Sequence, residues 1–171
     1  TLPMGQWYGG VSVPMTGIAA VGIAPEHRGS GAAIALMQNV VRELYESGIP
    51  LSVLYPATQR LYRKAGYEQG GSYCSWKIPT QSIQIQEQPL PAIPVALENF
   101  EWQKLYQQQA KSNNGNLERH QAIWQKLMQP DEKETIYAYL LGSLERPEGY
   151  IIFRQRRGEN KSYLVVRDWV I

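Results

Sequence analysis

The segment GIAPEHRGSGAA, residues 22–33, constrains the fold more than any other part of the chain. A strand-like run stops at Pro25, and a charged, glycine-rich turn follows it. From about Ala32 to Ser47 the apolar residues recur with a helical period on one face: Ile34, Met37, Val40, Val41 and Leu44. A strand, a glycine turn and a helix are the first part of a crossover connection. We therefore expect an α/β fold with its crossover near residues 32–47.

The rest of the first part of the chain continues this alternation. Extended structure is predicted over residues 7–24, as WYGGVSVP and GIAAVGIA bracketed by Pro14 and Pro25. LSVLY (51–55) is a β-type run, TQRLYRKAGY (58–67) a short helix that Gly66 stops, and YCSWKI (73–78) another strand. Ile83 and Ile85 alternate and predict a last edge strand, in a Pro- and Gln-rich stretch over 79–94 that otherwise indicates a connector.

The second part of the chain has a different pattern. Two helices are predicted, over 98–111 and 117–128, with Trp102 and Trp124 on their core faces. Three β-type runs follow, over residues 135–142, 149–155 and 162–171, separated by turn sequences. Such an order favours an antiparallel meander.

Composition excludes several classes of protein. The 17 Lys and Arg against 15 Asp and Glu give a net charge of +2, so we expect no nucleic-acid binding. No apolar run approaches the roughly 20 residues that cross a bilayer, so we expect no membrane contact. One cysteine, Cys74, and two distant histidines, His27 and His120, predict neither disulfides nor a metal site. A cytoplasmic, metal-independent protein is the expectation.

Three phosphate-binding devices could explain the glycine turn. A P-loop requires a lysine after its last glycine, and none follows Gly31. A dinucleotide fingerprint requires a third glycine and an acidic residue about 20 positions later, and both are missing. Bare amides at the start of a helix remain as an anion site. The alternative is that the small residues only let the turn pack tightly.

The flanking residues point to a family. AAVGIAPEHRGSGAA resembles the acyl-CoA motif R-x-x-G-x-[GA] of the GCN5-related N-acetyltransferases (GNATs), with Arg28, Gly31 and Ala33 at the marked positions. LYRKAGY resembles the Y-x-x-x-G-[YF] segment that ends the family signature, with Tyr62, Gly66 and Tyr67 in register. The strand LSVLY lies between the two motifs, as the family pattern requires.

The resemblance implies a site for acetyl-CoA as co-substrate. Backbone groups of a strand at Val21, Gly22 and Ile23 would pair with the pantetheine arm, after this strand splays from its neighbour. Ala57 and Thr58 would border the coenzyme from the other side. The pyrophosphate would receive backbone amides of one continuous stretch: Gly29, Ser30, Gly31, Ala32, Ala33 and Ile34. RGSG lacks the further arginines that some relatives carry, so binding would rest on amides and Arg28.

The same resemblance implies a catalytic role for Tyr62. A positioned phenol can protonate the thiolate that leaves when an amine attacks acetyl-CoA. The alternative is that Tyr62 is a packed aromatic residue. No general base is assigned, because GIAAVGIA carries no carboxylate and because Glu26 and His27 fit a solvated turn.

A narrower resemblance links the chain to the Eis (enhanced intracellular survival) branch of GNATs. It is carried by WYGGVSVPMTGIAAVGIAPEHRG and by LENFEWQKLYQQQAKSNNGNLERHQAIWQKLM followed by GYIIFR. It implies a homo-oligomer, a hexamer in that branch, and the C-terminal half of a catalytic GNAT domain in 1–85. Residues 86–171 would be the N-terminal half of a second, non-catalytic GNAT-like domain. We expect an internal fragment, so that Ile171 does not supply the terminal carboxylate that serves as base in that branch.

The function expected from these resemblances is N-acetyl transfer from acetyl-CoA to a primary amine by direct attack. The acceptor would be an aminoglycoside, a polyamine or a lysine. A non-catalytic acyl-CoA-binding or scaffold protein with the same fold is the alternative. A third possibility, a nucleotide phosphate in the glycine turn, predicts tighter binding of ATP or NAD than of coenzyme A.

Overall fold

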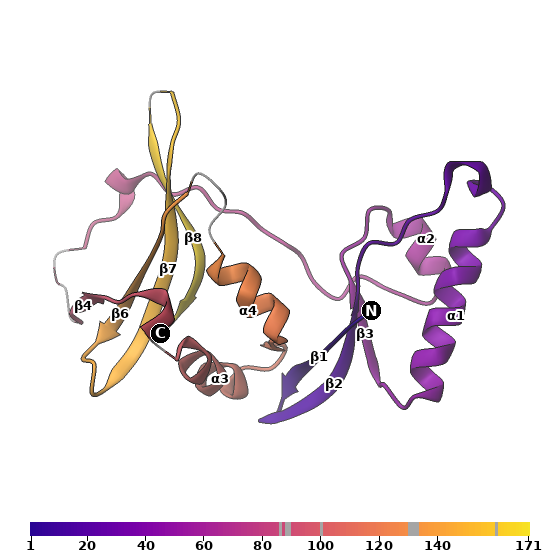
Figure 1. The fold of residues 1–171 in the computed structure, drawn as a ribbon, viewed down its shortest axis with the longest axis horizontal. Coiled ribbons are helices and arrows are strands. Elements are labelled where there is room, and N and C mark those ends of the chain that lie inside the picture. Colours follow the sequence, from indigo (N-terminus) through magenta and orange to yellow (C-terminus); the bar gives the residue numbers. More distant parts are fainter. Residues whose placement is uncertain (86, 88–89, 100, 130–133, 160) are drawn as a thin grey trace. The chain divides into compact units, whose positions relative to one another are not determined.

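The computed structural model describes residues 1–85, 87, 90–99, 101–129, 134–159 and 161–171. The chain divides into two compact units, one of Thr1–Gln6 with Ser12–Ile83 and one of Trp7–Val11 with Gln84–Ile171. Figure 1 shows the helices and strands in sequence colours, and their bounds are β1 Leu2–Tyr8, β2 Val11–Ile18, α1 Ala32–Glu46, β3 Leu51–Leu54, α2 Gln59–Lys64, β4 Ala92–Pro94, α3 Trp102–Ser112, β5 Leu117–Glu118, α4 Gln121–Met128, β6 Ile136–Gly142, β7 Pro147–Arg157 and β8 Ser162–Val170.

A tight turn interrupts the extended run that the sequence predicts at residues 7–14. Gly9 and Gly10 both have positive φ, 55° and 78°, as a two-residue turn between adjacent strands requires. β1 and β2 are neighbours in one sheet, on either side of this turn. Pro14 lies inside β2 rather than at its end. It precedes the residues that pair with β3, so its missing N–H removes no bond on that side.

The predicted crossover is confirmed. β2 and β3 pair in parallel, with Met15 opposite Leu51 and Ile18 opposite Leu54, and α1 connects them. The helix predicted over 32–47 is α1, and Gly48 ends it with a left-handed backbone (φ 72°). Met37 of α1 is fully buried and packs with Tyr62 and Ala65.

The strand predicted to continue to Ala24 ends at Ile18, so Val21–Ile23 are not a strand. The reason lies at Ala20, whose φ is 55° although it has a side chain. A left-handed residue bends the backbone away from an extended path. The chain then leaves the pairing with β3 and runs to a short 3-10 turn at Pro25–His27.

Two strands predicted after α2 are wrong. Residues 73–78 and Ile83 and Ile85 form no strand, and a 3-10 turn occupies Thr80–Ser82. In the predicted connector, Ala92–Pro94 form β4, which pairs with β6 although its sequence is short and Pro-rich. Residues 86, 88 and 89 of that connector lie outside the described residues. Strands depend on partners as well as on alternation, and no described residue pairs with 73–78.

The antiparallel meander predicted for the second part is confirmed as β6, β7 and β8. The helix predicted over 98–111 begins at Trp102, after a 3-10 turn, and residue 100 lies outside the described residues. The helix predicted over 117–128 begins at Gln121, because Leu117–Glu118 form β5 in the sheet of β1. His120 caps α4 with its ring nitrogen, which accepts from the Ala122 amide at 3.2 Å.

The core of the second unit lies between its helices and one face of its sheet. Trp102, Leu105 and Tyr106 of α3 and Trp124 of α4 are buried against residues that alternate along the strands: Ala138, Leu140, Tyr150, Ile152 and Val170. Trp102 and Tyr150 meet edge to face, with ring centroids 5.3 Å apart. The pairing of Ala138 with Ile152 and of Leu140 with Tyr150 places these side chains on one face.

A buried polar cluster lies within this apolar core. Asp168 accepts two hydrogen bonds from Arg119, at 2.6 and 2.8 Å, and one from the Tyr150 hydroxyl at 2.6 Å. The guanidinium also lies 3.6 Å from the centroid of the Tyr106 ring. Burial and the hydrogen bond to Asp168 raise the pKa of Tyr150. The Tyr150 hydroxyl therefore remains a donor at physiological pH.

Candidate active site

The candidate site belongs to the first unit and lies where β2 and β3 end. Because these strands are parallel, the segments that follow them leave the same edge of the sheet. Residues 19–31 follow β2 and lead into α1, and residues 55–58 follow β3 and lead into α2. The two motifs that the sequence indicated are thereby brought to one edge of one unit.

The glycine turn presents backbone amides at the start of α1. Gly29 and Gly31 have φ values of 81° and 89°, and Gly31 is the N-cap residue of the helix. The backbone amides of Gly29, Ser30, Gly31 and Ala33 form no hydrogen bond of normal geometry with any described residue. The Ala32 amide has only a long contact, 3.4 Å, to the Ser30 hydroxyl. Free amides at a helix start attract anions.

The side chains of Ser30 and Arg28 contact backbone carbonyls of the turn and of the residues just before it. The Ser30 hydroxyl donates to the carbonyl of His27 at 2.7 Å, and this bond stabilises the turn over residues 27–30. Arg28 is exposed, and its Nε lies 3.5 Å from the carbonyl oxygen of Ile23. The Ile34 amide, which the family resemblance assigned to the pyrophosphate, bonds the Gly31 carbonyl at 3.1 Å in the first turn of α1.

Tyr62 combines a buried ring with an open hydroxyl. Its exposed fraction is 8%, and it packs with Met37 and Ala65. The hydroxyl has no hydrogen-bond partner among the described residues, and it is not one of the buried polar atoms that lack a partner. Its oxygen is therefore open to solvent while the ring is fixed by packing. A phenol in this state can donate a proton to a bound molecule.

The spacing of Tyr62, Gly66 and Tyr67 follows from the way α2 ends. Gly66 is left-handed (φ 98°), and its amide bonds the carbonyl of Arg63 at 3.1 Å. The Tyr67 amide reaches back to the carbonyl of Tyr62 at 3.0 Å. This pair of bonds is a Schellman motif, which places the residues at its two ends in contact. The rings of Tyr62 and Tyr67 accordingly meet edge to face at 6.3 Å.

The other predicted site residues lie around this cluster. Val21 is half-buried and packs against Met37, Tyr62 and Ala65, so the structure brings it together with the predicted acid. Gly22 is exposed and Ile23 half-buried. Ala57 and Thr58 are exposed between β3 and α2, with Thr58 as the N-cap residue of α2 and no bond from its hydroxyl to a described residue.

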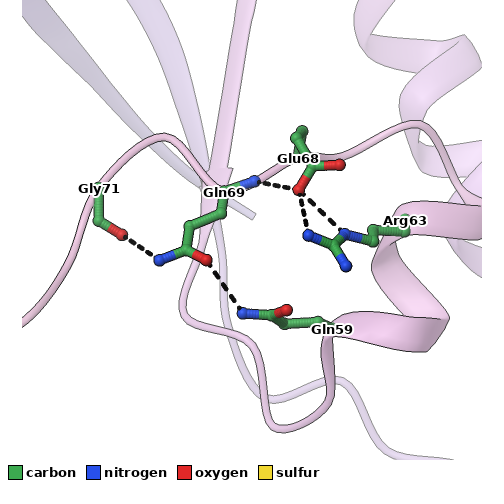
Figure 2. A network of polar contacts seen from close by, with 5 residues as sticks. All are labelled: Gln59, Arg63, Glu68, Gln69 and Gly71. Carbon is green, nitrogen blue, oxygen red and sulfur yellow. Dashed lines mark hydrogen bonds and ion pairs between the residues drawn. The ribbon is translucent and has the colours of Figure 1, made fainter.

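Figure 2 shows a polar network that joins α2 to the loop after it. Arg63 donates to one oxygen of Glu68 at 2.9 and 2.7 Å, and the Gln69 amide donates to the same oxygen at 2.9 Å. These bonds lower the pKa of Glu68, the Arg63 bond most. Gln69 also joins Gln59 and Gly71. The charge of Arg63 is thus already neutralised within the loop.

Sequence reasoning missed two polar residues at this site. The Ser52 hydroxyl of β3 lies 2.7 Å from the Tyr67 hydroxyl, and Glu68 binds Arg63. A serine inside a strand run gives no signal of such a partner. The Arg63–Glu68 pair could have been predicted only from the turn at Gly66, which ends α2 and brings the residues after it back beside the helix.

Two negative findings concern the described residues only. Over the described ranges no group of three or more His, Cys, Asp or Glu side chains is arranged to hold a metal ion. Within the same ranges no helix has the length and apolar character needed to cross a bilayer.

Family models and solved structures match both parts of the chain. Residues 3–70 match one acetyltransferase (GNAT) domain model, and residues 115–171 match a second acetyltransferase (GNAT) domain model. The structure superposes with a TM-score of 0.93 on a GCN5-related N-acetyltransferase from Anabaena variabilis, at 62% identity, over 99% of this chain and 44% of that one. The fold is therefore the mixed α/β fold of GNAT acetyltransferases.

Curated relatives are more distant. The N-acetyltransferase Eis of Mycobacterium tuberculosis is 23% identical over 167 residues, which cover 90% of this chain and 40% of that protein. An uncharacterized N-acetyltransferase of Streptomyces avermitilis is 31% identical over 81 residues, 47% of this chain and 20% of that protein. The chain thus spans less than half the length of each of these relatives.

Proposed function

We propose that this protein, in which residues 3–70 and 115–171 match acetyltransferase (GNAT) domain models, transfers an acetyl group from acetyl-CoA to a primary amine. The family uses acetyl-CoA as its donor. The acceptor class that we propose is an aminoglycoside, a polyamine or a lysine side chain.

The observation that carries the proposal is that one unit contains both unbonded backbone amides and a tyrosine hydroxyl without a hydrogen-bond partner among the described residues. The amides of Gly29, Ser30 and Gly31 lack partners among the described residues, and the Tyr62 hydroxyl also lacks one. Backbone N–H donors and a phenol O–H donor, both without a partner among the described residues, therefore lie on segments that follow the same edge of the sheet. In acetyl-CoA the pantetheine arm joins an anionic pyrophosphate to the thioester, and these two groups match such a pair of sites.

In the proposed reaction the amine nitrogen attacks the carbonyl carbon of the thioester. A C–N bond forms and the C–S bond breaks, and the electron pair of that bond stays on sulfur. The Tyr62 hydroxyl gives its proton to the sulfur, so free coenzyme A leaves as the thiol. The proton lost by the amine passes to water, and the Tyr62 phenolate regains a proton from water. No general base is assigned among the described residues. Val21 and Met37 pack around the Tyr62 ring and limit its movement.

Turnover with a panel of amines tests this function. We expect the full-length protein to release coenzyme A thiol from acetyl-CoA in the presence of kanamycin, spermidine or a lysine peptide, faster than without an amine. Mass spectrometry of the amine should show one added acetyl group. Binding of acetyl-CoA with no turnover of any amine would contradict the proposal and favour an acyl-CoA-binding protein instead.

We further infer that the protein belongs to the Eis-like branch and shares its homo-oligomeric assembly. The 23% identity to Eis extends over 90% of this chain, so it reaches both of the stretches that match GNAT domains. We place the boundary between the two domains at residues 85 and 86, between those stretches.

A further inference from the structure

Tyr67 is tied to the sheet by a side-chain hydrogen bond. Its hydroxyl lies 2.7 Å from the hydroxyl of Ser52, and the pair is partly buried. Ser52 lies in the middle of β3 and pairs with Thr16 of β2, so its position is fixed by the backbone of the sheet. The bond therefore fixes the Tyr67 ring relative to the strands.

Tyr67 in turn restrains Tyr62. The Tyr67 amide bonds the Tyr62 carbonyl, and the two rings meet edge to face with an interplanar angle of 77°. α2 has only six residues, too few to be stable without contacts outside itself. The other tie to the loop, between Arg63 and Glu68, is solvent-exposed and therefore screened. The partly buried Ser52–Tyr67 bond is the stronger restraint on the ring of Tyr62.

We propose that Ser52 and Tyr67 are positioning residues that hold the Tyr62 hydroxyl where it can protonate the leaving sulfur. This inference rests on the proposed function. Proton transfer in the transition state requires donor and acceptor within hydrogen-bond reach, and a misplacement of about 1 Å lowers the rate strongly. A ring that loses its Ser52–Tyr67 support samples more orientations, so the productive one becomes rarer.

An isosteric pair at residue 52 isolates the hydroxyl. Ser52→Thr keeps a hydroxyl and Ser52→Val replaces it by a methyl group of similar size, so both variants share any packing change. We expect kcat of Ser52→Val to be about tenfold below that of Ser52→Thr, with similar KM for acetyl-CoA. Tyr67→Phe should show the same loss as Ser52→Val, because both remove the same bond. Coenzyme A release with the best amine of the panel measures these rates.

A second background separates positioning from a general structural role. In the Tyr62→Phe protein we expect Ser52→Val to cause no further loss of kcat, because no proton donor remains to be positioned. Equal kcat for Ser52→Thr and Ser52→Val, or an unchanged tenfold loss in the Tyr62→Phe background, would overturn the positioning role and leave Tyr62 as acid. If Tyr62→Phe itself keeps full activity, the acid role in the proposed mechanism fails and the positioning role fails with it.

Discussion

Replacing Tyr62 by phenylalanine should lower kcat about 100-fold, because general acid catalysis by a positioned side chain contributes roughly that factor. The ring packs with Met37 and Ala65, and phenylalanine keeps those contacts. The hydroxyl bonds no described residue, so its removal leaves no partner unpaired. KM for acetyl-CoA should therefore change little, since the loss concerns the transition state alone.

Tyr45→Phe is the matched control for this substitution. Tyr45 lies on α1 and is 83% exposed, and its hydroxyl has no hydrogen-bond partner among the described residues. Its variant should match the natural protein in kcat and in KM. An unchanged kcat in the Tyr62 variant would refute the acid role, and a fall in both variants would show that the loss is not specific to Tyr62.

Replacing Asp168 by asparagine should cost about 3 kcal/mol of unfolding free energy in the second unit. Asp168 is 8% exposed and balances the Arg119 guanidinium, to which it offers both carboxylate oxygens. Asparagine has one acceptor oxygen and no charge, so a largely buried cation loses its counter-ion. Burial alone would lower the pKa of Arg119, but the bonds and the charge of Asp168 outweigh it and raise that pKa. Asp168 is therefore the group that offsets the cost of burying the Arg119 charge, and asparagine removes that compensation.

Urea unfolding followed by tryptophan fluorescence measures this loss. The buried tryptophans Trp7, Trp102 and Trp124 all belong to the second unit, whereas Trp76 of the first unit is 83% exposed. The signal therefore reports mainly on the second unit. Glu101→Gln, which breaks the exposed pair with Lys104, is the control and should change stability by at most about 0.5 kcal/mol. A loss below about 1 kcal/mol for the Asp168 variant would contradict a stabilising role for the cluster.

Elements with strong periodicity were predictable from sequence. α1 has an apolar face over four turns and a glycine after its last residue, and both signals are local. In β6, β7 and β8 apolar and polar residues alternate, turn sequences separate the strands, and each strand pairs with the next one in the chain. Residues close in sequence settled these pairings, so a single chain was enough to predict them.

Elements that depend on distant partners were not predictable. β5 is two residues long and exists because the chain pairs there with β1, which lies more than 100 residues earlier. Asp168 and Arg119 are 49 residues apart, and no pattern links them. A β-bulge at Arg167 shifts the register of β8, and the Arg167 side chain then bonds carbonyls at the end of α4. The alternation of apolar and polar residues along β8 does not indicate this shift in register.

The candidate site was predictable where a motif reflects backbone geometry. Gly31 and Gly66 both have positive φ, which is why glycine occupies these motif positions. The left-handed Ala20 breaks the same rule, and a strand prediction across it therefore failed. Ser52 was missed because its role depends on a hydroxyl fifteen residues away.

The affinity of coenzyme A for two glycine variants tests the central claim, that the glycine turn holds the acetyl donor. A Cβ at Gly31 or Gly70 would meet no atom within 4 Å, but only Gly31 has a left-handed backbone. In Gly31→Ala the free turn relaxes to avoid a strain of about 1–2 kcal/mol, and binding must restore it. Calorimetry of the full-length protein should show Kd about tenfold weaker for Gly31→Ala and unchanged for Gly70→Ala. Equal affinities for the two variants, or tighter binding of ATP than of coenzyme A, would contradict the claim.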